Sequence, residues 1–583
     1  MKPKIYITYE MVFDETPLDV LEYLKTLDRD WLIRFALLLI QSNDKYESIT
    51  QYASQCFCKE NSQFVYHVLS KLDKNIQGKS HNTPAEIIPH EYFIVSETTG
   101  LELLRQVFAI EKFEIVSSHV LQEQNLFKAI LLINASISKA EVNPEYTERG
   151  ELSDLFFAKS MFCNFLNNYE RNNILPEYII ILQVIKGFYF FKYCENSKLK
   201  EHLRLFLERN EFSSWEQYLY NAIKLLLFPL KNEVGYSTIL LDEKGNGYTF
   251  LHSHAFPIDS IIPAEQNIDY TYFKSHPLIE VDTKTFMPIN TLFCVNHLYR
   301  SIYFEFRAIN ERLKGTKHFL KGRGLLTIFT TEFSEQYLFD TFVRKIIKRQ
   351  KGVKLSDNDC KAIANIGHEP DFYFRDGNHI LLFENKDIMI ADYVKRSGNY
   401  EEIEKVLTSK LIEEAEISQL IHNIKSIDEG KFVWDKSITK NPRIYPILVI
   451  DDSSLCAPGL NYILNSAFKD MLEEANVKVK VFPLVVIELD TLIAFTQDFE
   501  SGKCKLRNVI DKYILFQNPK PISTERKIEP SKIMRLVFQK YFPFYHFFSE
   551  HYEHKPFNDK LFDEICDALR KANDIPPSED SRY

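Results

Sequence analysis

The chain has 583 residues, of which 45% are hydrophobic, 26% charged and 14% aromatic. This composition excludes a disordered or low-complexity chain, and at about 150 residues per domain the length predicts three or four domains. The formal net charge of −10 excludes a general polycationic attraction to nucleic acid, so any such affinity must be local. Only 17 residues are glycine, well below the usual share of ~7%, which favours a helix-rich architecture.

Residues 1–235 show apolar positions spaced by three and four, which predicts an all-helical regulatory or interaction domain. A repeat array is not expected, because no period near 34 or 40 residues recurs. Residues 236–324 hold short β-branched and aromatic runs broken by glycine and proline, typical of strands and turns in a small mixed module. A helix through HLYRSIYFEFRAINERLK and a basic linker follow.

Residues 325–520 alternate between helical and strand-like segments, which predicts an α/β domain. TEFSEQYLFDTFVRKIIKRQ has the spacing of an amphipathic helix, and DFYFRDGNHILLFENK indicates two strands joined by a hairpin turn. The runs RIYPILVIDD and KVKVFPLVVIELD predict further strands of the same sheet, with a helix between them. Residues 521–583 indicate a linker followed by aromatic-rich C-terminal helices.

Two carboxylates stand at the same end of the predicted hairpin. Asp371 opens its first strand and Glu384 closes its second, so folding at the Asp-Gly turn places their Cβ atoms about 5–8 Å apart. Two carboxylates at that separation suit a hard cation. Side chains alternate across a strand, so Lys386 points to the same face as Glu384 while Asn385 points away.

Pro370-Asp371 followed by Glu384-Asn385-Lys386 resembles the motif of the PD-(D/E)XK nuclease superfamily. The resemblance covers residues 325–520 and implies a restriction-endonuclease-like core: a helix, a three-stranded meander, a helix and a further strand. It implies that Asp371, Glu384 and the main-chain carbonyl of Asn385 bind Mg²⁺, for which Mn²⁺ can substitute. Lys386 would position or activate the attacking water.

Two further positions follow from the same resemblance. Many members of the superfamily carry an acid on the first helix, and Glu335 matches it as a catalytic and metal-binding residue, with Glu332 as the alternative. Gln419 resembles a polar residue that some subfamilies place on the following helix, so it is the last expected catalytic residue.

The chemistry of phosphodiester hydrolysis agrees with these residue types. A divalent cation neutralises the charge of the transition state and lowers the pKa of a bound water, and a lysine beside the metal is expected to have its ammonium form disfavoured. The alternative is a structural pair of strand-end acids with a solvated lysine. Glu-x-Lys triplets also occur by chance, as at Glu429 and Lys431, so the interpretation depends on the hairpin.

Residues 312–354 carry eleven basic and three acidic side chains, a local charge of +8 directly upstream of the hairpin. A polyphosphate substrate needs such a patch near the metal. The alternative is a helix whose basic face is simply solvated. The residues expected to bind nucleic acid are Lys345, Lys348, Arg349 and Lys351.

Other candidate sites are weaker. His252, His254 and Asp259 have the residue types of a metal site, but no further histidines follow at ligand spacing, which favours a turn or strand with exposed imidazoles. Cys56 and Cys58 lack the second pair of a structural zinc site, and the nine scattered cysteines favour the cytoplasm. The sequence has no P-loop, no signal peptide and no apolar stretch that predicts a membrane span, so no membrane partner is expected.

The expected function is a Mg²⁺-dependent endonuclease acting on DNA. About 320 N-terminal residues exceed what a free-standing nuclease needs, so they are expected to serve control, homo-oligomerisation or partner docking. The architecture is analogous to prokaryotic restriction or anti-phage effectors, with a separately encoded ATPase or sensor as a candidate partner. Two alternatives stay open: a non-catalytic nucleic-acid-binding or scaffolding protein with a degenerate nuclease fold, and an RNA-cleaving nuclease.

Overall fold

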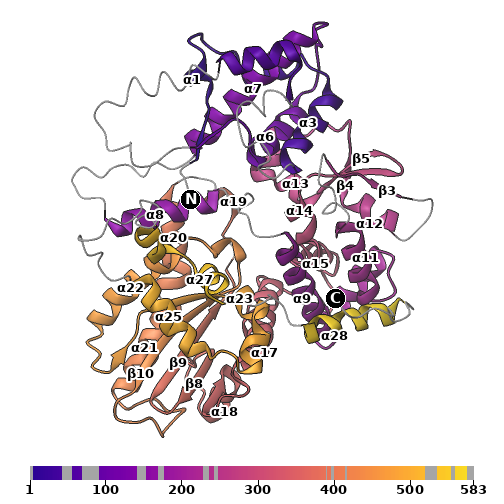
Figure 1. Cartoon of the computed structure of the whole chain (residues 1–583). Helices are drawn as coiled ribbons and strands as arrows, with labels where there is room; N and C mark the ends of the chain where they lie inside the picture. Colours follow the sequence, from indigo (N-terminus) through magenta and orange to yellow (C-terminus); the bar gives the residue numbers. More distant parts are fainter. Residues whose placement is uncertain are drawn as a thin grey trace.

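The computed structural model describes residues 4–41, 56–68, 91–140, 153–167, 176–227, 236–241, 247–388, 390–395, 399–413, 416–518, 535–552 and 559–573. Within these ranges the protein is helix-rich and contains two mixed sheets and one short strand pair, which confirms the expected helix-rich α/β class. Figure 1 shows the N-terminal helices at one end of the molecule and the larger sheet at the other.

The first helices form a small bundle of their own. α6 begins with a capping box in which Ser96 and Thr99 exchange hydrogen bonds between side chain and backbone. Gly100 of α6 lies so close to α3 that a Cβ atom would sit 2.9 Å from the carbonyl oxygen of Ala36. The elements are β1 (Lys4–Tyr6), α1 (Tyr9–Val12), α2 (Val20–Leu24), α3 (Arg29–Gln41), β2 (Glu91–Phe93), α6 (Glu97–Ala109) and α7 (His119–Ala140).

A four-stranded sheet follows in the order β3-β6-β5-β4. Its region contains more helix than the sequence predicts: GYTFLHS forms α12, because Phe250 and Leu251 are fully buried against neighbouring helices. The elements are β3 (Ile239–Leu240), α12 (Gly247–Ser253), β4 (Ala255–Pro257), η4 (Ala264–Tyr270), α13 (Thr271–Ser275), β5 (Leu278–Asp282), β6 (Thr285–Pro288) and α14 (Thr291–Asn296).

Five further helices belong to the two apolar clusters that cover the faces of the larger sheet. α9 is apolar on all sides and is buried along most of its length, as expected for a helix enclosed by other elements. These helices are α8 (Asp154–Asn167), α9 (Pro176–Glu195), α10 (Lys200–Arg209), α11 (Trp215–Leu227) and α15 (Ile302–Arg312).

The larger sheet has the strand order β11-β10-β9-β8-β7, with β12 also paired to β10. β7, β8 and β9 form an antiparallel meander, and β10 runs parallel to β9. The expected order of helix, meander, helix and strand is therefore present. The strands are β7 (Val353–Ser356), β8 (Phe372–Asp376), β9 (His379–Lys386), β10 (Arg443–Ile450), β11 (Lys480–Val481) and β12 (Val485–Glu488).

Prolines explain why KVKVFPLVVIELD forms two short strands instead of one. β11 pairs with Arg443 and Ile444 of β10, and β12 pairs with the segment that begins at Ile447. Pro446 lies between these two pairings and Pro483 lies between the two short strands. A proline has no backbone N–H to donate to a neighbouring strand, so the pairing is interrupted at these two prolines.

Both faces of the larger sheet are covered. Leu381 and Phe383 of β9 belong to one apolar cluster, and Ile380 and Leu382 belong to a second on the opposite face. The strand therefore reads as a continuous apolar run, as expected for a strand buried on both sides. The helical elements of this region are α16 (Gly324–Thr327), η5 (Ile328–Leu338), α17 (Phe339–Ile347), α18 (Asp357–Ile363), α19 (Asp392–Lys395), α20 (Tyr400–Leu407), η6 (Thr408–Ile412), α21 (Glu416–Asp428), η7 (Ser453–Leu455) and α22 (Leu460–Glu474).

The apolar clusters cross the boundaries that the sequence suggests between domains. One cluster includes residues from Tyr178 of α9 to Leu569 of α28, and a second joins Phe162 of α8 to the opposite face of the larger sheet. A third joins the N-terminal bundle to the four-stranded sheet. The remaining helices are α23 (Leu489–Ala494), α24 (Thr496–Ser501), α25 (Leu506–Gln517), η8 (Gln539–Tyr541), α27 (Phe544–His551) and α28 (Asp559–Ala572).

All nine cysteines are free, as their spacing predicts. Among the described helices, none has both the length and the apolar character that crossing a bilayer requires.

Candidate active site

The two expected acids lie at the same end of β8 and β9. Phe372 pairs with Phe383, so Asp371, one residue earlier, stands beside Glu384, one residue later. The backbone N–H of Asn385 donates to Asp371 Oδ2 over 2.6 Å. Glu384 is 1% exposed. The hairpin therefore places this carboxylate pair as its sequence predicts.

The metal-free pair favours protonation. Loss of solvation raises the pKa of Asp371 to about 7, although the Asn385 N–H opposes this shift. Burial raises the pKa of Glu384 well above its usual range, and the nearby charge of Asp371 adds to the effect. Two neighbouring carboxyl groups in a desolvated site resist double ionisation, so a cation is the natural partner of the ionised pair.

Lys386 lies beside this pair between two further acids. Its Nζ atom is 2.7 Å from Glu416 Oε1 and 3.9 Å from Glu335 Oε1. Burial opposes the ammonium form, but Glu335 and Glu416 outweigh it and raise the pKa of Lys386. The expected disfavouring of the ammonium form refers to a lysine beside a bound metal ion, whereas without the ion Glu335 and Glu416 determine the direction of the shift.

Gln419 of α21 holds the most buried acid in place. Its Nε2 atom donates to Glu384 Oε2 over 3.0 Å and to the carbonyl oxygen of Glu369 over 2.8 Å. Glu416 lies three residues earlier on the same helix, so both side chains face the strand ends. Glu416 is the site residue that sequence reasoning missed, and its spacing from Gln419 was the available signal.

The first-helix acid at the site is Glu335 and not its alternative Glu332. Glu335 Oε1 accepts the N–H of Asp387 over 3.2 Å, and burial raises the pKa of Glu335. Glu332 instead accepts the hydroxyl of Tyr193 and pairs with Lys198 at 2.9 Å. Both acids lie on η5, a π-helix, a geometry that often occurs at functional sites.

A cavity with aromatic and charged walls lies at the carboxyl ends of β9 and β10, beside Asp387, whose N–H donates to Glu335. It has about 50 Å³ of space for water, enough for about three molecules at ~15 Å³ each. Its charged lining residues are Lys186, Arg300, Asp387, Asp451 and Asp452.

A buried lysine joins the elements around this cavity. Lys186 of α9 contacts Asp451 at 2.5 Å and Asp490 at 2.6 Å, and all three side chains are almost inaccessible. Ser334 Oγ, next to Glu335, donates to Asp451 Oδ2 over 2.8 Å. The network therefore connects α9, the end of β10 and the helix that carries Glu335.

Of the basic residues expected to bind nucleic acid, Lys351 lies toward the other end of the sheet. Lys351 precedes β7, whose first residue, Val353, pairs with Arg375 near the hairpin turn. Arg375 pairs with Ile380, four residues from Glu384, so the two ends are about 13 Å apart at ~3.3 Å per residue.

Three of these basic side chains have partners on other elements. Lys345 donates to the hydroxyl of Tyr189 over 2.9 Å and lies against its ring. Lys348 lies 3.5 Å from Glu500, and Arg349 donates to the carbonyl oxygen of Ser501 over 3.1 Å. Lys351 is exposed. Lys348, Arg349 and Lys351 are therefore the exposed members of the four, and Lys345 is half-buried.

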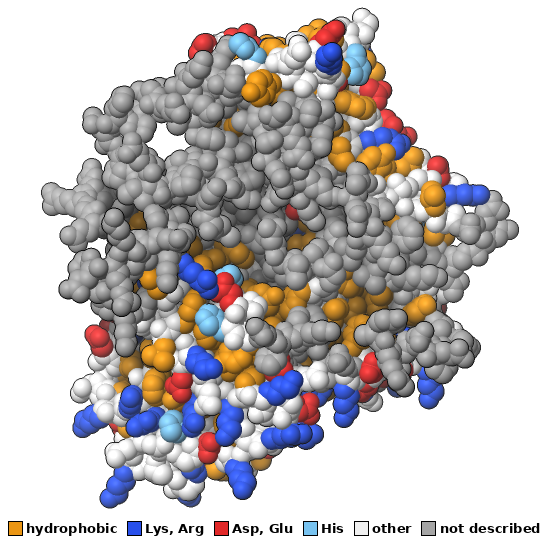
Figure 2. Space-filling model, in the orientation of Figure 1, with side chains coloured by type: hydrophobic (Ala, Val, Ile, Leu, Met, Phe, Trp, Pro, Cys, Tyr) orange, Lys and Arg blue, Asp and Glu red, His pale blue; other side chains and the backbone are white. Residues whose placement is uncertain are grey.

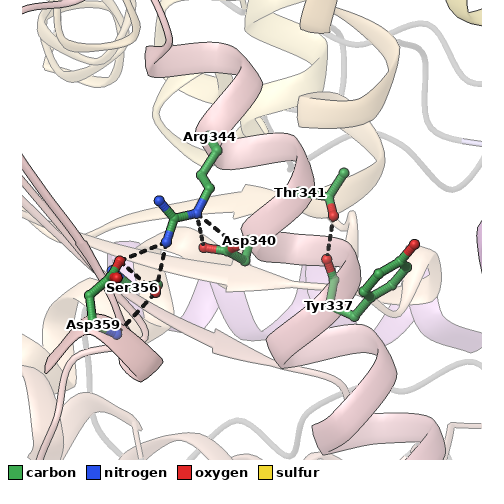
Figure 3. A network of polar contacts seen from close by, with 6 residues as sticks. All are labelled: Tyr337, Asp340, Thr341, Arg344, Ser356 and Asp359. Atoms are coloured by element: carbon green, nitrogen blue, oxygen red, sulfur yellow. Dashed lines mark hydrogen bonds and ion pairs between the residues drawn. The ribbon is translucent and has the colours of Figure 1, made fainter. Parts of the chain in front are cut away.

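Arg344, also part of the basic segment, has a structural role. It pairs with Asp340 on its own helix and with Asp359 at 2.7 Å, and it donates to Ser356 (Figure 3). Ser356 and Asp359 form the capping box of α18. Figure 2 shows further lysines and arginines spread over the part of the molecule that contains the larger sheet.

The histidine group differs from its expected form. His252 is exposed at the end of α12, but His254 is buried, so the expected pair of exposed imidazoles is wrong. The Glu-x-Lys triplet at Glu429 and Lys431 forms an exposed ion pair, unlike the buried triplet on β9.

No family model, no curated protein and no solved structure matches this chain.

Proposed function

We propose that the protein is a Mg²⁺-dependent nuclease that hydrolyses phosphodiester bonds, with DNA as its substrate. The observation that carries this proposal is the meeting of Asp371, Glu384 and Lys386 at one end of two paired strands. Gln419 and Glu335 reach the same place from the two flanking helical segments. The pattern is that of a nuclease of the PD-(D/E)XK type.

The donor set fits magnesium. All candidate ligands are oxygen atoms, and Mg²⁺ needs only one or two carboxylates because it keeps several waters. Glu384 Oε1 is buried and no N–H or O–H of the described residues donates to it, so it needs a cation, a water or a proton shared with Asp371. Bound Mg²⁺ would supply charge neutralisation and a lower pKa for an attacking water. Asp371 and Glu384 would hold it, with Glu335 and the carbonyl of Asn385 as further donors.

The remaining residues position the acids or donate hydrogen bonds. Gln419 fixes one oxygen of Glu384, and the Asn385 N–H fixes one oxygen of Asp371. Glu416 and Glu335 keep the Lys386 ammonium group charged and beside the acids. Lys386 Nζ therefore acts as a hydrogen-bond donor that orients the attacking water and stabilises developing negative charge.

The size of the surrounding helical structure supports regulated activity. A nuclease core joined to larger helical regions is analogous to restriction and anti-phage effectors, so activation by a signal or partner belongs to the proposal. The second candidate is a non-catalytic nucleic-acid-binding or scaffolding protein. It is favoured by the tight Lys386–Glu416 ion pair, which resembles a structural contact.

The test is cleavage of supercoiled plasmid, linear duplex DNA, single-stranded DNA and RNA, with Mg²⁺ or with EDTA. We expect Mg²⁺-dependent cleavage of DNA, and Lys386→Ala should lower the single-turnover rate by at least about a hundredfold. Lys431→Ala is the matched control, because it removes the lysine of the exposed Glu-x-Lys triplet. Cleavage of RNA and not of DNA would show that RNA is the substrate. Equal rates for Lys386→Ala and wild type would show that Lys386 is not catalytic.

A further inference from the structure

Two histidines and a glutamate converge outside the acidic site. His254 lies between α12 and β4, His297 directly follows α14, and Glu305 lies on α15. One ligand atom from each residue lies within 4.8 Å of the other two. His254 and His297 are buried at 6% and 4% exposure, and their rings meet edge to face with centroids 4.5 Å apart.

The hydrogen bonds of the two rings show which nitrogen faces the cluster. His254 Nδ1 donates to the carbonyl oxygen of Phe250 over 2.8 Å, so Nε2, which faces Glu305 Oε1, is the nitrogen that can bind a metal. His297 Nε2 lies 3.1 Å from the carbonyl oxygen of Lys274, which leaves the lone pair on Nδ1. Metal-binding histidines commonly donate their other ring N–H to a backbone carbonyl in this way.

The free nitrogen of His297 has no partner among the described residues. Its Nδ1 atom is buried without a hydrogen bond, although buried polar atoms are normally satisfied. Burial lowers the pKa of His297 to about 3, so its ring is neutral and the lone pair is available.

We propose that His254 Nε2, His297 Nδ1 and a carboxylate oxygen of Glu305 form a binding site for Zn²⁺. Two imidazoles and one carboxylate suit zinc among the divalent ions, and three protein ligands leave one position for water. Tetrahedral zinc with bonds of about 2.1 Å needs donor atoms roughly 3.4 Å apart. His254 Nε2 and Glu305 Oε1 are already 3.5 Å apart.

A second group of potential ligands shows why this one is preferred. Cys58, His119 and Glu123 also lie within 4.8 Å of one another. Both oxygens of Glu123 already accept the Cys58 N–H, and Asn61 donates to one of them. His119 is 70% exposed. The Glu123 carboxylate therefore already has its hydrogen-bond donors and does not need a cation.

The proposed zinc would join the four-stranded sheet to the long helices. His254 precedes strand β4, whereas Glu305 is next to Phe306, whose ring packs on Phe190 of α9. Phe306 also contacts Phe329 of η5. The ion would fix α15 between the sheet and the elements that border the acidic site.

The test measures bound metal in the full-length protein. Zinc is removed with EDTA, Zn²⁺ is added back, and the retained metal is counted after dialysis. The Asp371→Asn background is used so that the acidic site contributes less. We expect one equivalent more in this protein than in its Glu305→Gln derivative, and a Tm that rises with Zn²⁺ only where the site is intact.

Two variants separate coordination from folding. His252→Gln removes a nearby exposed imidazole and should retain the metal. His297→Cys places a sulfur near the position of Nδ1, so its Co²⁺ form should show a thiolate-to-cobalt charge-transfer band that the parent lacks. Equal metal content in the parent and Glu305→Gln, or a Co²⁺-loaded His297→Cys protein without that band, would overturn the proposal.

Discussion

At the scale of single residues, burial favours the neutral form of the carboxyl pair, whereas neighbouring acids favour the charged form of the lysine. Asp371 and Glu384 have raised pKa values because they lose solvation side by side, whereas Glu416 and Glu335 keep Lys386 charged. The metal-free site therefore holds more protons than its residue types would in water. Its ionisation costs folding free energy, which makes the site sensitive to pH and to cations.

The stability of the metal-free protein should depend on Asp371 as pH changes. The folded pKa is about 7, above the ordinary value of 3.8, so the folded state binds the extra proton between these values. This contribution is fully present below about pH 4 and is lost as pH rises through about 7. In EDTA, the difference between the Tm of Asp371→Asn and that of wild type should therefore increase in favour of the variant as the pH rises from 5 to 8.

Added Mg²⁺ should reverse this trend in wild type only, because a bound cation favours the ionised carboxylate. Thermal unfolding at three pH values, with and without Mg²⁺, measures both effects. A constant Tm difference across the pH range would show that Asp371 does not titrate in this window.

The two acids of η5 give a matched pair of variants. Glu335→Ala should raise the Mg²⁺ concentration for half-maximal cleavage by about 10–100-fold, since Glu335 lies within the site. Glu332→Ala should leave that concentration unchanged, because its partners are Tyr193 and Lys198. Magnesium titrations of the single-turnover rate distinguish them, and the opposite ranking would move the first-helix acid to Glu332.

At the scale of secondary-structure elements, α17 carries basic residues with different surroundings. Lys345 is packed against Tyr189, and burial lowers its pKa, whereas Lys348 is 70% exposed and Lys351 is also exposed. The separation of about 13 Å between the acids and the sheet end near Lys351 corresponds to about four base pairs of duplex DNA at ~3.4 Å each. The exposed side chains are better suited to contact such a substrate than Lys345.

Nucleic-acid binding should follow this difference in exposure. In a cleavage-dead Asp371→Ala background, Lys348→Gln with Lys351→Gln should weaken binding irrespective of sequence. The slope of log affinity against log salt should fall by about 0.9 for each lost contact with duplex DNA. Lys345→Gln should instead lower the Tm with little change in that slope. Unchanged affinity in the double variant would remove this segment from the binding surface.

The hairpin was predictable from sequence because its signals are local. The two apolar runs on either side of the Asp-Gly turn are sufficient to place Asp371 beside Glu384. Contacts between distant segments have no such signal. Glu416 reaches Lys386 from α21, thirty residues away, and His297 meets His254 only through the packing of α14. The helical form of GYTFLHS likewise depends on tertiary burial of Phe250 and Leu251.

At the scale of the whole molecule, a buried ion network connects regions that are distant in sequence. Lys186 belongs to the N-terminal half, while Asp451 and Asp490 follow strands of the larger sheet. Burial disfavours the ammonium group, but Asp451 and Asp490 raise the pKa of Lys186. Buried pairs are expensive to break because the remaining charge is left without a partner.

Removal of this lysine should therefore destabilise the whole protein. Lys186→Met leaves Asp451 and Asp490 unpaired, so we expect a loss of about 3–5 kcal/mol in unfolding free energy. Lys192→Met is the control, because Lys192 is exposed on the same helix. Chemical denaturation of the three proteins measures the difference, and equal midpoints would show that the network does not hold these regions together.

The apolar cluster that runs from α9 to α28 also sets an order of events during synthesis. Trp215 and Tyr218 of α11 share this cluster with Ile565 and Leu569 of the last described helix. A ribosome that adds 5–20 residues per second needs about 17–70 s to pass from residue 227 to residue 569. Throughout that interval Trp215 and Tyr218 lack the apolar side chains of α28. The nascent chain must therefore leave part of their surface exposed to solvent or bound by chaperones. The complete cluster, and the sheet packed against it, becomes available only after nearly the whole chain has been translated.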